Sequence, residues 1–187
     1  MLLDDNRIDI NIEDDKGNKA IHIAMNNENF EIQELLKKHS GVVETDKVKI
    51  LRDFIICGNS LLEFNIMKSL VEEDPDLINS KDERGRSPLH IACIWNRERI
   101  VEFFLTLPGI DVNSADKSLS GGWTALNYAV IYGSESLIEL LLKYPGIDVN
   151  YKDGFGCTAL EIIEGNSQDE IKSDKDKIKA LFEKYSR

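Results

Sequence analysis

Apolar and polar positions form two short helical patterns within residues 82–113, separated by a polar break near Asn96. A turn motif, Asp-x-x-Gly at 82–85, precedes the first pattern. Ser-Pro at 87–88 fits a helix N-cap followed by proline at the first helical position. Pro-Gly at 108–109 fits the end of the second helix. The segment therefore predicts a turn, two short antiparallel helices and a loop.

The same pattern recurs along the chain at a nearly constant spacing. The motif at 82–92 appears 68 residues earlier, at 14–24, with identical Asp, Gly, His and Ala positions. Its later part appears again 37 residues on, at 122–129, and after a further 34 residues the motif appears at 153–160. Because several units share one register of about 34 residues, the pattern predicts a repeat protein whose units stack on one another.

Residues 87–92 have the sequence Ser-Pro-Leu-His-Ile-Ala, which resembles the Thr-Pro-Leu-His-x-Ala signature of the ankyrin repeat. The resemblance implies an all-α fold: an ankyrin-repeat solenoid of stacked helical hairpins with short turn or β-hairpin fingers. It also implies that His22 and His90 form hydrogen bonds to the backbone between turns. The small Ala92 is expected to let neighbouring helices approach closely.

The register divides the chain into six expected segments. They are the tail of a partial or degenerate preceding repeat (1–11), repeat 1 (12–45), an irregular repeat 2 (46–79), repeat 3 (80–113), repeat 4 with an enlarged finger (114–150) and a C-terminal capping repeat 5 with an insertion between its helices (151–187). Repeat 2 lacks the turn motif, and its first helix is expected to be capped by Thr45 or Asp46. The last helix of repeat 5 is expected to be capped by Ser173 or Asp174.

The first residues match the second helix of a repeat. Leu2-Leu3 followed by 8–11 corresponds to Leu141-Leu142 followed by 147–150. Either the sequence is a piece of a longer array or its first repeat is degenerate, and both interpretations stay open. A clipped array would leave apolar surface at this end, so self-association there is the alternative to the monomer that we expect.

The charge and the cysteines narrow the classes of partner. Lys and Arg total 23 against 34 Asp and Glu, which gives a net charge of −11. This balance disfavours binding to the DNA backbone or to an anionic membrane, so we expect no nucleic-acid and no membrane partner. The three cysteines, Cys57, Cys93 and Cys157, form no metal-binding or disulfide pattern. Reduced thiols are typical of an intracellular protein, and we expect a cytoplasmic location.

No catalytic motif is found in the sequence. A phosphate-binding loop, a dinucleotide-binding glycine motif and a zinc-protease motif are all missing, and Asp-Gly-Phe-Gly at 153–156 is explained as a repeat turn. We therefore expect no enzymatic activity, no cofactor and no metal site. The resemblance also raises hydroxylation of Asn113 or Asn150; the alternative is that these side chains hold their loops together.

Ankyrin repeats usually bind proteins through the turn fingertips and the inward-facing first helices. By register, the predicted partner-binding residues are Arg84, Arg86, Trp95, Leu119, Trp123, Ile131, Tyr132 and Phe155. Both tryptophans of the chain fall at such positions, and Trp, Tyr and Arg are enriched in binding hot spots. The alternative is that these aromatic side chains pack against adjacent fingers or cover the gap left by repeat 2.

The expected function is that of a non-enzymatic protein–protein interaction module, a scaffold, adaptor or inhibitor. Its partner would be another protein. The alternative is a targeting or regulatory ankyrin segment of a larger polypeptide that also carries an enzyme, which the mid-repeat start favours.

Overall fold

The chain forms two compact units, Met1–Lys47 and Val48–Arg187. The computed structural model describes residues 44–57, 61–117, 122–132, 134–165 and 175–185. The description below therefore concerns the second unit. The expectations for the N-terminal tail, repeat 1 and His22 lie outside the described residues.

Helices make up the regular structure of the described residues, which contain no strand. In chain order they are α3 (Glu44–Cys57), α4 (Leu61–Glu73), the 3-10 helix η2 (Pro75–Asn79), α5 (Pro88–Ile94), α6 (Glu98–Leu105), α7 (Ala125–Tyr132), α8 (Glu135–Leu142), α9 (Ala159–Gly165) and α10 (Lys175–Tyr185). The predicted all-α repeat solenoid is confirmed. Its fingers are turns closed by backbone hydrogen bonds rather than strands.

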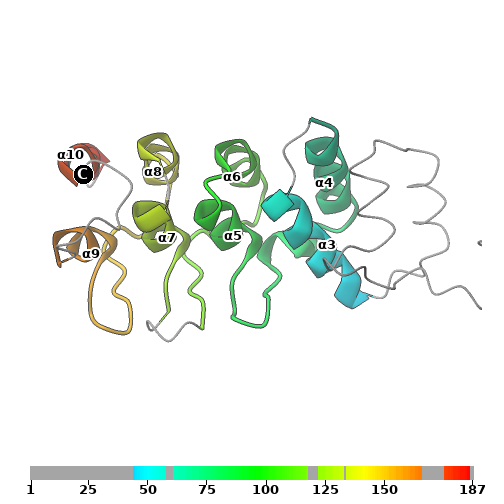
Figure 1. The fold of residues 1–187 in the computed structure, drawn as a ribbon, viewed down its shortest axis with the longest axis horizontal. Helices are drawn as coiled ribbons and strands as arrows, with labels where there is room; N and C mark the ends of the chain where they lie inside the picture. The colour runs from blue at the N-terminus through cyan, green and yellow to red at the C-terminus, as the bar shows by residue number, and fades with distance from the viewer. Residues whose placement is uncertain (1–43, 58–60, 118–121, 133, 166–174, 186–187) are drawn as a thin grey trace, which may run out of the picture. The chain divides into compact units, whose positions relative to one another are not determined.

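The helices form two rows (Figure 1). The inner row contains α5, α7 and α9, and the loops that we call fingers project from its side; α6, α8 and α10 form the outer row. Contacts run along each row, between α5 and α7 and between α7 and α9, and between the two helices of each pair. A pair cannot bury its apolar face alone, so each repeat depends on its neighbours.

Helix α5 illustrates why these short segments fold. Ser87 is the N-cap in an extended conformation, and Pro88 takes the first helical position. Ala92 is fully buried, like its counterpart Ala129, which allows α5 and α7 to pack closely. The helix ends at Ile94 with Trp95 as its C-cap, and Asn96 follows with a φ of 50°, a left-handed conformation that asparagine tolerates better than most residues.

Repeat 2 departs from its neighbours in its first helix. Helix α3 has 14 residues, whereas α5 has seven. It begins at Glu44, so the expectation that Thr45 or Asp46 caps it is wrong: both lie within its first turn. The other end is stabilised from repeat 3, because the Arg97 Nε donates to the Ile55 carbonyl oxygen at 3.1 Å. A guanidinium at a helix C-terminus complements the helix dipole.

Helix α10 closes the C-terminal end of the array. Ile178 and Phe182 are buried on the side that contacts α8 and α9. On the outer side, Glu139 of α8 accepts a hydrogen bond of 2.6 Å from the Tyr185 hydroxyl and one of 3.1 Å from the Lys184 ammonium. Together with Lys143, these donors lower the pKa of Glu139 to about 2. The last helix is thus attached by an apolar stripe and a polar seam.

Candidate functional site

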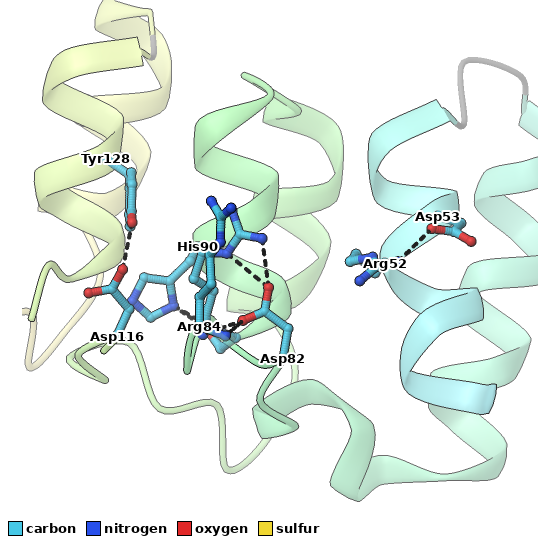
Figure 2. A network of polar contacts seen from close by, with 9 residues as sticks. Arg52, Asp53, Asp82, Arg84, His90, Asp116 and Tyr128 are labelled. Carbon is cyan, nitrogen blue, oxygen red and sulfur yellow. Dashed lines mark hydrogen bonds and ion pairs between the residues drawn. The ribbon is translucent and has the colours of Figure 1, made fainter. Parts of the chain in front are cut away.

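A partly buried aspartate shapes the finger of repeat 3 (Figure 2). The Asp82 Oδ1 accepts hydrogen bonds from the backbone amides of Arg84 and Arg86, both at 2.9 Å. Its Oδ2 accepts one of 2.8 Å from the Arg86 Nε. Burial opposes the charge, but the hydrogen bonds from Arg86 outweigh it and lower the pKa of Asp82. Arg86 is thus used to build the finger, while the side chain of Arg84 is exposed.

The other fingers repeat this aspartate with different exposed residues. The Asp153 Oδ1 accepts from the amides of Phe155 and Cys157 at 2.9 and 3.0 Å, which places Phe155 at the tip with 73% of its surface exposed. The Asp116 Oδ1 accepts from the Trp123 amide at 2.8 Å. Because the carboxylate fixes each turn, the tip residues are free to differ.

Neighbouring fingers also contact one another. The Lys117 amide donates to the Arg84 carbonyl oxygen at 2.7 Å. Gly85 lies beneath this contact with a φ of 73°, and a Cβ there would come within 2.8 Å of the Lys117 Cγ. Glycine is required for both the conformation and the close approach.

His90 joins repeat 3 to repeat 4. Its Nδ1 accepts a hydrogen bond of 3.0 Å from the Ser87 amide, and its Nε2 donates to the Trp123 carbonyl oxygen at 3.0 Å. Burial, assisted by the charge of Lys81, lowers the pKa of His90 to about 4. The neutral imidazole is therefore the working form, and the backbone-bonding role expected for His90 is confirmed.

Asn127 occupies the corresponding position in repeat 4. Its Oδ1 accepts from the Thr124 amide at 2.9 Å and from the Thr124 hydroxyl at 2.6 Å. Its Nδ2 is buried without a hydrogen-bond partner within the described part of the chain. The shorter amide caps its own helix but forms no bond to the next finger. In the last repeat Glu161 takes this place, and its Oε2 accepts from the Thr158 amide at 2.7 Å.

A second connection between repeats comes from asparagines before each finger. The Asn79 Nδ2 donates to the Gly109 carbonyl oxygen at 2.7 Å, and its Oδ1 accepts from the Asp111 amide at 2.9 Å. Asn113 makes the same two bonds to the next loop, to Gly146 at 2.8 Å and from Asp148 at 2.8 Å. These bonds support the loop-holding interpretation of Asn113. The bonds of Asn79 were not predicted; its position 34 residues before Asn113 was the available signal.

Two predicted contact residues are exposed at equivalent places on adjacent helices. Trp95 follows the last residue of α5 and is 50% exposed, and Tyr132 is the last residue of α7 and is 41% exposed. They lie 37 residues apart, which is the spacing of their repeats. The ring of Tyr132 stacks on that of Tyr128, with centroids 6.3 Å apart and planes inclined by 22°.

The contacts of Trp123 are those expected if its side chain packs against an adjacent finger. Its indole Nε1 donates to the Asp153 Oδ2 in the next finger at 3.2 Å. Its ring also meets Tyr128 edge to face, with centroids 5.2 Å apart. The Tyr128 hydroxyl in turn donates to the Asp116 Oδ2 at 2.6 Å (Figure 2). The half-buried Trp123 therefore connects the fingers of repeats 4 and 5 through its polar and apolar atoms.

The remaining predicted residues fall in different places. Ile131 is only 8% exposed and belongs to the core, so the expectation that it reaches a partner is corrected. The position of Ile131 in the repeat register did not reveal that its side chain is buried. Leu119 lies outside the described residues. Leu61, at the start of α4, is 59% exposed and was not singled out in the sequence; its position 34 residues before Trp95 was the available signal.

Neither a metal site nor a membrane-spanning helix is found among the described residues. The described residues hold no cluster of His, Cys, Asp or Glu suited to a metal ion. None of their helices combines the length and the apolar character that crossing a bilayer requires. Cys93 and Cys157 are free thiols, and burial raises the pKa of the Cys93 thiol.

The paired helices, the aspartate-closed fingers and the histidine that joins adjacent turns define a helical repeat protein of the solenoid class. A family model of ankyrin repeats in three copies matches residues 59–153. The chain belongs to the ankyrin repeat family. Ankyrin repeats are generally protein–protein interaction modules, and ankyrin domains are typically non-catalytic.

An ankyrin repeat-containing protein of Schizosaccharomyces pombe is 32% identical to the chain over 60 residues. Those residues make up 32% of this chain and 24% of that protein. The similarity thus spans about a quarter of the length of the relative.

Proposed function

We propose that repeats 3 to 5 bind a partner protein without catalysing a reaction, through a face formed by the fingertips and the C-terminal ends of α5 and α7. We call this surface the finger face; its members are Arg84, Trp95, Tyr132 and Phe155. The observation that carries the proposal is the exposure of Trp95 and Tyr132 at equivalent positions of adjacent repeats. Neither side chain is needed to fill the core, and both leave large apolar area in contact with water.

Two terms in the free energy of association favour binding at Trp95 and Tyr132: the burial of apolar surface and the small loss of side-chain entropy. Transferring apolar surface out of water contributes about 25 cal/mol per Å². Trp and Tyr provide this area with few rotatable bonds, so little entropy is lost when a partner covers them. Phe155, held at a turn tip by Asp153, adds a third apolar contact on the same set of fingers. Trp123 is left out of the proposed contact because its indole is engaged with Asp153.

The proposal is tested by capturing binding proteins from the source cell on the immobilised chain and then measuring their affinities in purified form. The double variant Trp95→Ala/Tyr132→Ala should weaken binding by at least about tenfold, about 1.4 kcal/mol. Tyr144→Ala, which removes a partly exposed aromatic residue that follows α8, is the matched control and should bind like the wild type. Circular dichroism should show the same helical signal for all three chains. Unchanged affinity of a folded double variant would refute the proposal.

A further inference from the structure

The charges of the described residues are unevenly distributed. The whole chain has a net charge of −11, which taken alone suggests a basic partner. Helices α4, α6 and α8 carry much of the excess, with seven glutamates against one lysine and one arginine. Two of these helices, α6 and α8, form the outer row of repeats 3 and 4 (Figure 1). These three helices are therefore acidic, whereas α10 in the same outer row carries Lys175, Lys177, Lys179 and Lys184 and pairs with Glu135 and Glu139 of α8.

The inner helices of the same repeats have no charged side chain at all. Neither α5 nor α7 contains Asp, Glu, Lys or Arg. Their exposed ends are the aromatic residues Trp95 and Tyr132. A partner lying on this row meets a neutral apolar surface and no competing charge.

The described fingers carry mostly exposed cations. Their exposed charged side chains are Lys81, Glu83, Arg84, Lys117 and Lys152. Part of this charge is offset within the fingers: Asp82 is paired with Arg86 at 2.7 Å and, together with Asp116, also attracts the Lys81 ammonium. Lys81 and Lys152 each have an acidic neighbour, Asp111 and Glu161 respectively.

Arg84 and Lys117 are the two cations best placed for a partner. The backbone hydrogen bond between them brings the two residues together at the junction of the fingers of repeats 3 and 4. Both side chains are exposed. The screening length in physiological salt is about 8 Å, so the glutamates of the outer helices only weakly offset a cation on the opposite side.

The aromatic residues connect these cations to the helix ends. Trp123 at the base of finger 4 contacts Tyr128, and Tyr128 stacks on Tyr132. This line follows α7, which has eight residues and therefore a length of about 12 Å. Tyr128 itself is buried, so the parts of this line that reach the surface are Trp123 and Tyr132. The length of α7 is short enough for a single peptide segment to reach both the fingertip cations and the apolar helix ends.

We propose, resting on the function proposed above, that the partner presents an acidic segment with an apolar anchor. Its carboxylates lie over Arg84 and Lys117, and its apolar side chain contacts Trp95 and Tyr132. Charge complementarity of this kind accelerates association and excludes wrong partners more than it adds affinity.

The test uses the full chain as bait for a displayed library of random peptides, followed by affinity measurement of the selected peptides. The wild type should enrich peptides in which Asp or Glu flank an aromatic residue or leucine. The variant Arg84→Glu/Lys117→Glu should lose the acidic preference and bind a selected peptide about tenfold more weakly at low salt, with the difference shrinking as salt rises. Lys68→Glu/Lys143→Glu changes the charge by the same amount on exposed residues outside the fingers and inner helices, and should select like the wild type.

The outcomes separate the two proposals. Enrichment of basic or uncharged peptides that still depends on Trp95 and Tyr132 overturns the acidic partner and leaves the finger face standing. Enrichment that survives Trp95→Ala/Tyr132→Ala overturns the finger face itself. Equal weakening by both charge-reversal variants also overturns the acidic-segment proposal, because the effect would then come from net charge.

Discussion

The position of His90 is occupied by a different residue in repeats 4 and 5, and the difference has a physical reason. His90, Asn127 and Glu161 all accept a hydrogen bond from the amide three residues earlier. Only the imidazole is long enough to donate to the next finger as well. In repeat 5 an exposed glutamate, which can only accept, completes the helix cap. The repeat register therefore sets which position caps the helix. Whether the side chain there also bonds to the next finger depends on which residue it is.

Asn127→His should stabilise the protein by about 1 kcal/mol, the usual net value of a hydrogen bond. In repeat 4 the Trp123 carbonyl oxygen accepts from both the Asp116 amide and His90 of repeat 3, each at 3.0 Å. The Cys157 carbonyl oxygen accepts only the corresponding Asp153 amide among the bonds described, which leaves it available for the new imidazole. Urea unfolding of the variant and the wild type measures the gain. Equal or lower stability would contradict the assignment of the Asn127 amide as an unsatisfied donor.

His90 should make stability sensitive to mild acid. Its pKa is about 4 in the fold against 6.5 ordinarily, so its contribution is complete above pH 6.5 and is lost as the pH falls toward 4. The loss by pH 5 is about 2 kcal/mol. His90→Asn lowers the unfolding free energy at pH 7, but it should remove the part of the pH dependence that His90 causes. The difference between the two chains in unfolding free energy at pH 7 and pH 5 isolates the effect, and parallel pH profiles would exclude it.

At the scale of the elements, loops between repeats are fixed by single side chains. Asn79 and Asn113 each use both ends of an amide to hold the following loop. Asn150 is the next member of the series, but its side chain is exposed, and the Asp148 carboxylate accepts from its backbone amide instead. The same residue type at the same register position is thus structural in one repeat and dispensable in the next.

Asn113→Ala should cost about 1 to 2 kcal/mol, because it removes two hydrogen bonds and leaves the Asp148 amide and the Gly146 carbonyl oxygen without that partner. Asn150→Ala is the matched control and should cost less than about 0.5 kcal/mol. Thermal unfolding of both variants provides the comparison. Equal losses would show that the side-chain bridge is not what distinguishes the two positions.

At the scale of the whole described array, stability is a sum of neighbour contacts. Helix α10 contributes to the contact between repeats 4 and 5 through Phe182, which is buried against α8 and α9. Its polar seam to Glu139 is on the surface, where such pairs contribute little. The apolar stripe is therefore the main attachment of the terminal repeat.

Phe182→Ala should cost about 3 kcal/mol or more, the usual effect of removing a buried aromatic side chain. Since only the terminal contact is lost, amide exchange should accelerate first in α9 and α10 and leave α5 and α6 protected. Hydrogen exchange resolved by segment measures this order. Uniform acceleration along the array would mean that the repeats unfold as one cooperative unit.

Much of this architecture could be predicted from sequence periodicity, because the core positions repeat with the same spacing as the helices. The solenoid, the bond from His90 to the next turn and the exposure of Trp95 and Tyr132 follow from one register. The register could not show which side chain in the next repeat meets a given residue. Hence the contacts of Trp123 with Asp153 and of Arg86 with Asp82, and the burial of Ile131, required coordinates.

The equivalence of Trp95 and Tyr132 has a consequence for how such a protein changes over time. Each side chain stands at the end of its own helix, and the fold around it is maintained by other residues. Under the proposed function, a substitution at either place would alter what the finger face recognises, while the buried residues keep the packing beneath it. Binding preference could then drift one repeat at a time, through a few independent replacements on an unchanged array.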